Sequence, residues 1–234
     1  MGILESGLLG PFRNKIGPAV GRKHNGQNLI VAAYRKSRKP PTGVQLWERE
    51  KFRLLNGFLS CIPDLVAPGF KKYAKKKSAL NAAYSYNYPN AFMPATPDND
   101  HSATGENADE EAKTAGPRLN FSALVYSRGD IAMPDGLNVS RHGNHVVFNW
   151  SAQQQSFYCQ LSDLASFLVC AEDEKDFVVR LRAAERHELS FEMEVPATFN
   201  GPLHCYMSFA SADGKLPGNS KYAGAITHFS IPTT

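Results

Sequence analysis

The chain has 234 residues, of which 42% are hydrophobic and 21% are charged, as in an ordinary globular protein with a buried core. Its formal net charge of +4 is unevenly spread, because residues 1–92 hold 16 Lys and Arg against 4 acids and residues 93–234 hold 10 against 18. The net charges of these two segments are therefore +12 and −8. No stretch approaches the ~18 apolar residues of a membrane helix, and the start lacks the features of a classical signal peptide. We expect no membrane span, and a place in the cytoplasm or in an assembled particle.

Four cysteines, Cys61, Cys159, Cys170 and Cys205, lie far apart with no CxxC pattern among them. Such spacing is typical of free thiols rather than of a disulfide framework. We expect all four to be buried and reduced.

Residues 7–36 are rich in glycine and basic, contain no acid, and predict a β-hairpin. Asn25-Gly26 is a strong hairpin signal because a type I′ turn needs positive φ at both central residues. The flanking strands are expected over Lys15–Arg22 and Gln27–Arg35. The second strand is apolar on both faces, with Leu29, Val31 and Ala33 on one and Ile30, Ala32 and Tyr34 on the other. A two-stranded hairpin cannot cover both faces, so the arm should pack on the rest of the chain or on another subunit.

Two helices should follow the hairpin. The first begins at a capping box formed by Thr42 and Gln45, and its apolar residues recur at helical spacing until Pro63 ends it. A short helical turn over Asp64–Phe70 leads to the second helix, Ser78–Asn87.

Residues 93–117 are polar and acidic, with almost nothing to bury, and predict a linker or long surface loop. From Arg118 onward the apolar pattern has a period of two, which indicates short strands, with Trp150 as a core residue. The expected strands are Asn120–Tyr126, Leu137–Arg141, His145–Trp150, Ser156–Leu161, Ser166–Cys170, Phe177–Ala183, Glu188–Val195, His204–Ala210 and Ala223–Phe229.

The predicted fold class is α+β. An N-terminal β-hairpin and two-helix region over residues 1–92 and the linker over 93–117 precede a sandwich over 118–234. The number and spacing of the strands favour an antiparallel immunoglobulin- or fibronectin-like arrangement.

No catalytic signature is present in the sequence. His142 and His145 flank Gly-Asn, which is more typical of a hairpin tip than of a metal pair. His204 and Cys205 are neighbours in a strand, so they point to opposite faces and cannot easily share an ion. We therefore predict no enzyme, no cofactor and no metal site.

The basic N-terminal half is the main candidate for function. Clustered cations with interleaved tyrosines can follow a phosphate backbone and stack on bases. The alternatives are a solvated surface and an interface with the acidic half of another copy, which would give head-to-tail contact. The candidate cations are Arg13, Lys15, Arg22, Lys23, Arg35, Lys36, Lys71, Lys72, Lys75, Lys76 and Lys77.

Several motifs occur in a characteristic order, from Lys15-Ile16-Gly17-Pro18 through Asn81-Ala82-Ala83 and Ser127-Arg128-Gly129 to Ser220-x-Tyr222-x-Gly224. In this order the chain resembles a family of uncharacterised bacterial proteins known only as a domain of unknown function. The resemblance covers nearly the whole chain and implies no catalytic residues.

Our leading hypothesis is a non-enzymatic structural protein that self-associates through its N-terminal arm, as a repeated subunit of a filament or particle. An uncovered edge strand is a template for pairing with another chain. The residues expected to make this contact are Phe12, Leu29, Ile30, Val31 and Tyr34. The alternatives are a nucleic-acid-binding protein that uses the basic half, and a sandwich that binds a ligand such as a carbohydrate through exposed aromatic rings, for which Phe148, Tyr158 and Tyr206 are candidates.

Overall fold

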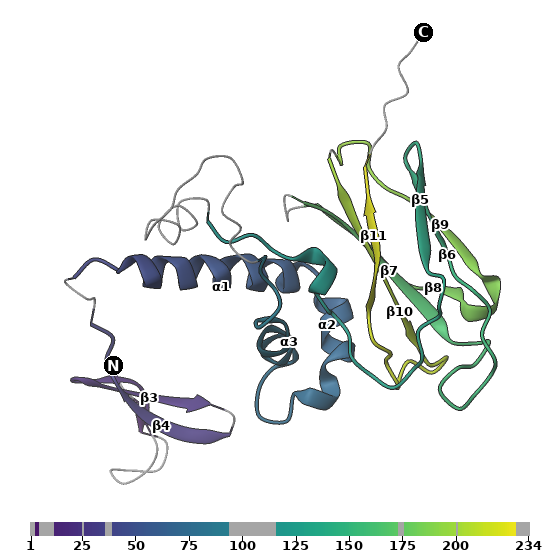
Figure 1. Ribbon diagram of the computed structural model, residues 1–234. Coiled ribbons are helices and arrows are strands. Elements are labelled where there is room, and N and C mark those ends of the chain that lie inside the picture. Colours follow the sequence, from purple (N-terminus) through teal and green to yellow (C-terminus); the bar gives the residue numbers. More distant parts are fainter. Residues whose placement is uncertain are drawn as a thin grey trace, which may run out of the picture. The chain divides into compact units, whose positions relative to one another are not determined.

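The computed structural model describes residues 3–4, 12–24, 26–35, 39–93, 116–172, 176–199 and 201–227. The chain divides into two compact units, residues 1–43 and residues 44–234 (Figure 1). Both contain antiparallel strands and the second also contains the helices, so the predicted α+β class is confirmed. Most of the predicted linker lies outside the described residues.

The first unit contains one sheet with the strand order β1-β2-β3-β4, and each neighbouring pair is antiparallel. Its strands are β1 (Ile3–Leu4), β2 (Phe12–Ile16), β3 (Ala19–His24) and β4 (Gln27–Ala32). The three longer strands make up almost all of this sheet.

The predicted hairpin turn is confirmed. His24 pairs with Gln27, and Gly26 between them has a φ of 81°. The predicted strand over Lys15–Arg22 is wrong, because Ile16 and Ala19 pair across a second tight turn at Gly17-Pro18. Gly17 takes a φ of 57° and Pro18 has no N–H for a ladder, so this dipeptide breaks the expected strand in two.

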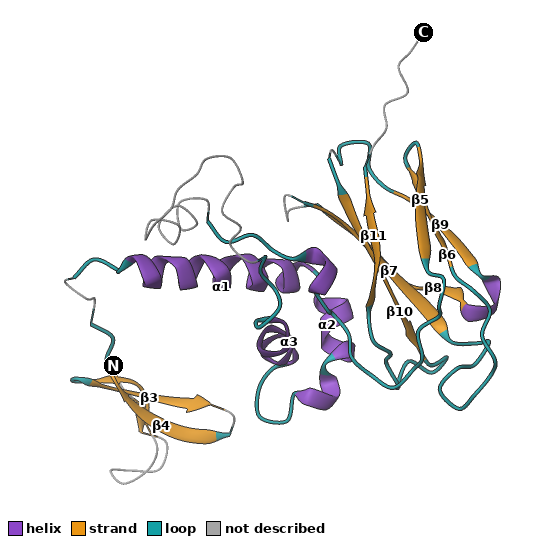
Figure 2. Cartoon of the chain, in the orientation of Figure 1, coloured by secondary structure: helices purple, strands orange, loops and turns teal. Residues whose placement is uncertain are grey.

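The second unit begins with helices α1 (Gly43–Cys61), α2 (Pro63–Gly69) and α3 (Ala79–Asn87), shown in purple in Figure 2. The first helix begins directly after Thr42 and ends before Pro63, as predicted. The expected short turn is a helix of its own, with Pro63 at its start, where a missing N–H costs nothing. Ser78 caps α3 by accepting a hydrogen bond from the N–H of Asn81 at 3.1 Å.

Two antiparallel sheets follow the helices. One has the strand order β5-β6-β9 and the other β11-β10-β7-β8. Their strands are β5 (Asn138–His142), β6 (His145–Asn149), β7 (Leu164–Ala171), β8 (Phe177–Glu185), β9 (Ser190–Glu194), β10 (Leu203–Ala210) and β11 (Lys221–Ile226).

The four-stranded sheet is covered on both faces. Phe167 and Val169 of β7 face the core that it shares with the three-stranded sheet, where Trp150 is also buried as predicted. Leu168 and Cys170 point the other way and join a second core made by the helices. Helices, four-stranded sheet and three-stranded sheet thus form three layers (Figure 1).

Two further predicted strands, both in the second unit, are wrong. Residues 120–126 form a single 3₁₀ turn, Phe121–Ala123, followed by extended chain, because Phe121, Leu124 and Tyr126 are all needed in the helical core. Residues 156–161 form a turn closed by backbone hydrogen bonds between Ser156 and Cys159.

The cysteine prediction is partly correct. All four cysteines are free thiols, and Cys159, Cys170 and Cys205 are buried. Cys61, the last residue of α1, is exposed, whereas Phe58 and Leu59 in the same turn are buried.

Candidate interaction surface

The outer strand of the first sheet, β4, presents an apolar edge. We call Asn28, Ile30, Ala32 and Tyr34 the β4 edge surface. Ile30 is 71% exposed and Tyr34 is 88% exposed. In the described part of the chain, β4 pairs only with β3.

The register of the β3–β4 ladder determines which backbone N–H and C=O groups of β4 point away from the sheet. The N–H of Ala33 donates to the carbonyl of Pro18 at 2.7 Å, so Ala33, Val31 and Leu29 direct their backbone groups toward β3. In an antiparallel ladder the alternate residues point the other way. The N–H and C=O groups of Asn28, Ile30 and Ala32 therefore face outward, available to another strand.

Two other edge strands, β8 and β9, carry features that block such pairing. In β8, Arg180 and Arg182 are exposed and Arg182 takes a φ of 49° at an irregular point of the register. In β9, Glu192 and Glu194 are exposed. Charges and bulges of this kind protect edges from adding strands. In contrast, the six residues of β4 are uncharged and pair with β3 without a register shift.

The opposite face of β4 is half-buried. Leu29 and Val31 lie directly across from Arg22 and Val20 of β3. Phe12 is also half-buried and packs over Gly21, whose position leaves no room for a Cβ beside the Phe12 carbonyl oxygen. Of the five apolar residues proposed for assembly, Ile30 and Tyr34 are thus open to a partner, while Phe12 packs within its own sheet.

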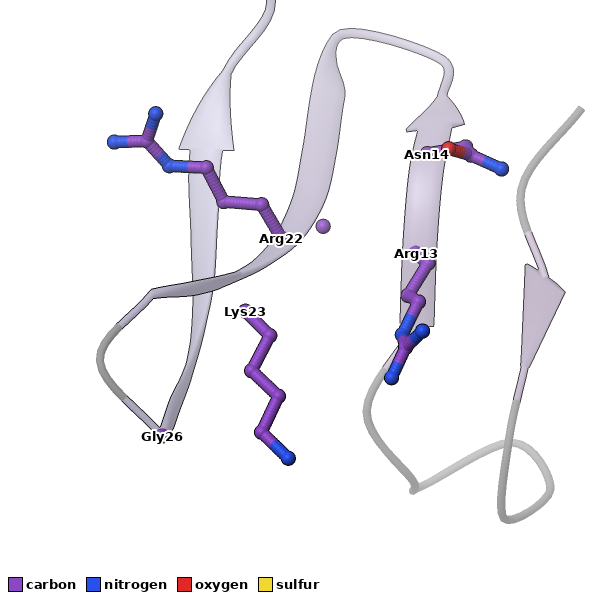
Figure 3. A pocket seen from close by; sticks show the side chains of 6 residues that line it. Arg13, Asn14, Arg22, Lys23 and Gly26 are labelled. Carbon is purple, nitrogen blue, oxygen red and sulfur yellow. The ribbon is translucent and has the colours of Figure 1, made fainter.

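A basic cavity lies on the same sheet (Figure 3). It has a volume of ≈ 520 Å³ and is lined by Arg13, Asn14, Gly21, Arg22, Lys23 and Gly26. Arg13 belongs to β2, whereas Arg22 and Lys23 belong to β3. In Figure 3 the side chains of Arg13 and Lys23 extend in the same direction, while Arg22 leaves β3 on the other side. Of the cations predicted from the sequence, Arg13, Arg22 and Lys23 line this pocket, with Arg22 directed away from the other two.

The other predicted cations are spread over both units. Lys15 and Arg35 are exposed in the first unit, and Lys36 lies outside the described residues. Lys71, Lys72, Lys75, Lys76 and Lys77 are all exposed around the turn between α2 and α3. Lys72 makes an ion pair with Asp130 at 3.1 Å.

The tyrosines near this lysine run are already in contact with other groups. The Arg128 guanidinium lies 4.5 Å from the ring centroid of Tyr73 and 4.0 Å from that of Tyr86. Tyr88 donates a hydrogen bond to Glu48, which raises the pKa of Tyr88 to about 12. One face of Tyr73 and one of Tyr86 are thus occupied. No local pattern predicts this contact, because Arg128 is distant along the chain.

The second unit has a smaller cavity of ≈ 120 Å³ beside His204. The His204 ring stacks on Phe121 at 3.9 Å between centroids, and its Nδ1 lies 2.9 Å from the Tyr222 hydroxyl. Burial lowers the pKa of His204, while Glu172 acts in the opposite sense. Glu172 also pairs with Arg118 at 3.2 Å at this cavity. The cavity is lined by both polar and apolar side chains and carries one cation and one acid, Arg118 and Glu172. The sequence analysis did not predict it.

A buried polar cluster at the other end of the four-stranded sheet has a structural explanation. Arg186 and Asp163 have side chains only 3% and 2% exposed and form an ion pair at 3.2 Å. Arg186 also donates to Gln153 and to the carbonyl of Ala132. These contacts join the loops after β6 and β8 and satisfy the buried charge, as such pairs require.

Two of the three aromatic residues considered for carbohydrate binding do not reach the surface. Phe148 and Tyr206 are fully buried, whereas Tyr158 is exposed beside Phe157. Among the described residues no group of His, Cys, Asp and Glu side chains could hold a metal ion. None of the helices in that part of the chain is long and apolar enough to cross a membrane.

Comparison with known proteins gives one family match. The model of a family of unknown function (DUF6266) matches residues 11–104 and 107–224. Among curated proteins, no match is found. The match covers both the first sheet and the sandwich.

Proposed function

The chain belongs to the family of unknown function DUF6266, and from its own surface we propose that it is a non-enzymatic structural protein that self-associates through its N-terminal sheet. The contact is the β4 edge surface, to which a second copy adds its own β4. The β4 pairing joins two copies, and a second contact between the basic and acidic halves of neighbouring pairs would make the chain a subunit of a filament or particle.

The observation that carries this proposal is the unprotected edge of β4. Ile30 and Tyr34 present large apolar area to solvent, and the outward backbone groups of alternate residues have no strand beside them in the described chain. Pairing would remove the apolar surface from water, worth roughly 25 cal/mol per Å², and would give the backbone groups partners. No competing charge has to be buried.

Charge distribution supports a repeating contact. The N-terminal 92 residues carry a balance of +12 and the remainder −8. Opposite patches on one molecule favour contact between different surfaces of neighbouring copies, which propagates unless the rotation closes a ring. Salt should therefore weaken the higher assemblies more than the β4 pairing itself.

We also propose that the sandwich has the strand arrangement of a fibronectin type III domain. In chain order, the first, second and fifth strands share one sheet and the third, fourth, sixth and seventh share the other. A sandwich of this kind is common in surface and adhesion domains, where it acts as a rigid support rather than as a catalyst, which agrees with a structural role.

Light scattering coupled to size-exclusion chromatography tests self-association. At physiological salt and tens of micromolar, we expect wild-type protein to elute as an oligomer. Ile30→Asp should give a monomer, because a carboxylate at this position would be desolvated between paired strands. Removal of residues 1–36 should have the same effect.

The matched control is Val44→Asp, which changes another exposed apolar residue and should leave the oligomer intact. Far-UV circular dichroism should confirm that both variants remain folded. A strictly monomeric wild type at this concentration would overturn the proposal.

A further inference from the structure

The loop between β6 and β7 exposes a group of apolar side chains. Phe157 and Tyr158 are 76% and 45% exposed, and their ring centroids lie 4.9 Å apart. Leu161 in the same loop is 46% exposed, and we call these three residues the apolar tip. Single exposed apolar residues are ordinary on a protein surface, whereas three in one short loop indicate a contact surface. Residues 151–162 contain no charged side chain, so burial of the tip desolvates no charge.

Hydrogen bonds hold this loop in place. Ser156 and Cys159 exchange two backbone hydrogen bonds, at 2.9 and 3.0 Å, on either side of the two rings. The buried Arg186 donates to Gln153 at 2.9 Å before the rings and pairs with Asp163 at 3.2 Å after them. The rings are therefore fixed before a partner arrives, which reduces the conformational entropy lost on binding.

A group of lysines lies beside the apolar tip. Lys72 pairs with Asp130 at 3.1 Å, and two residues further on the N–H of Ala132 donates to the carbonyl of Tyr158 at 2.9 Å. Asp130 raises the pKa of Lys72 and Tyr158 adds to this effect, so the Tyr158 side chain is close to Lys72. Residues 65–93 contain no acid. The other lysines of this segment are exposed as well, namely Lys71, Lys75, Lys76 and Lys77.

We infer that this surface of the second unit binds a membrane that contains anionic lipids. The apolar tip enters the boundary between headgroups and acyl chains, while the lysines of the α2–α3 turn attract the lipid phosphates. Peripheral binding strengthens with both the apolar area inserted and the attraction of basic residues to anionic lipids. The inference does not depend on self-association, because all of these residues lie in the second unit and Ile30 lies in the first.

The arrangement of the rings favours lipid over a single-stranded nucleic acid, which also offers phosphates. Bases stack on open ring faces. Phe157 and Tyr158 are perpendicular, with 90° between their planes, so the edge of one ring meets the face of the other. Arg128 covers one face of Tyr73 and one of Tyr86. Insertion among acyl chains needs no stacking geometry, because the hydrophobic effect is non-directional.

Co-sedimentation of the full chain with lipid vesicles tests the inference. Vesicles of phosphatidylcholine alone are compared with vesicles in which phosphatidylserine replaces about a third of the lipid. We expect binding to the anionic vesicles at ~0.1 M salt and release toward ~1 M, where the screening length falls to about 3 Å. Phe157→Ser should weaken binding roughly tenfold, because the inserted ring is lost. Lys75→Gln should weaken it about fivefold, the effect of one lysine near an anionic surface.

Leu46→Ser and Lys15→Gln are the matched controls. They remove an exposed apolar residue from α1 and an exposed lysine from the first unit, and each should change binding by less than about twofold. Losses equal to those of Phe157→Ser and Lys75→Gln would indicate diffuse attraction and overturn the assigned surface. Absence of binding to the anionic vesicles at ~0.1 M salt, or equal binding to phosphatidylcholine alone, would overturn the lipid assignment.

Fluorescence anisotropy with a labelled single-stranded oligonucleotide of about 20 nucleotides measures the competing partner. Oligonucleotide binding that is lost in Phe157→Ser, without binding to anionic vesicles, would identify a nucleic-acid surface and overturn the inference. The Ile30→Asp variant should still bind anionic vesicles and show the same loss when Phe157→Ser is added. Failure of membrane binding is thus distinguishable from failure of self-association.

Discussion

Gly21 illustrates how a single residue shapes the first sheet. A Cβ at this position would lie 1.9 Å from the carbonyl oxygen of Phe12 and 2.7 Å from Cδ2 of its ring. Real structures do not contain such contacts, and the obstacle includes backbone that cannot rotate away. The glycine therefore permits Phe12, at the start of β2, to lie directly against β3.

We expect Gly21→Ala to disrupt the first sheet while leaving the second unit folded. Hydrogen exchange should show loss of amide protection across residues 12–32, with Trp150 fluorescence unchanged. Gly57→Ala is the control, because an added Cβ there meets nothing within 4 Å and alanine in a helix is favoured by up to about 1 kcal/mol. Retained protection in Gly21→Ala would show that the close approach of Phe12 is not needed.

His204 couples stability to pH. Burial lowers the pKa of its imidazole below the ordinary value of 6.5, so the folded state favours the neutral ring. Above pH 6.5 both states are neutral and the group has no effect. As the pH falls below 6.5 the unfolded chain takes up the proton more readily, so the free energy of unfolding decreases.

Denaturant unfolding between pH 8 and pH 5 checks this expectation. His204→Asn keeps a polar group near the Tyr222 hydroxyl and should reduce the loss of stability on the acid side of pH 6.5. His142→Asn, at the exposed β5–β6 turn, should retain the wild-type slope. Identical slopes in all three proteins would contradict a lowered pKa at His204.

At the level of elements, the predicted boundaries are correct where the sequence contains residues with a strong preference for turns or helix caps. The hairpin turn between His24 and Gln27 and the start of the first helix after Thr42 lie where predicted. The predicted strand over Lys15–Arg22 is wrong because Gly17-Pro18 favours a turn, which divides this segment between two strands. The predicted strand over Asn120–Tyr126 is wrong for a different reason. Its apolar residues pack in the core formed by the helices, and the local sequence pattern does not indicate this.

The surfaces of single elements were harder to predict than their positions. The apolar character of β4 was visible in the sequence, but whether its edge is open depends on which strands lie beside it. Likewise, the cations Arg13 and Lys23 are ten residues apart in the sequence and line the same pocket only because β2 and β3 are neighbours. The His204 cavity draws on segments from Met93 to Tyr222, a combination that no local pattern predicts.

For the molecule as a whole, the central layer is the four-stranded sheet. Because β7 is buried on both faces, a side chain such as Leu168 stabilises helices and sheet together. We expect Leu168→Ala to lower the free energy of unfolding by about 2–5 kcal/mol. The helical circular dichroism signal and the Trp150 fluorescence should shift together.

Leu216→Ala is the control, since Leu216 is exposed in the loop between β10 and β11 and its loss should change the free energy of unfolding little. Separate transitions for the helical signal and the tryptophan would show that the three layers do not unfold cooperatively.

The sequence by itself determined the mixed class, the main helices, most strands, the reduced cysteines and the strongly basic N-terminal half. These depend on composition, periodicity and turn residues, which act over a few positions. Only the tertiary structure decided that helices cover one face of the four-stranded sheet, that β4 is an unprotected edge, and that cations from two strands line one cavity. Each of these depends on which segments become neighbours, and that choice is made by burial of apolar surface across distances that no local pattern covers.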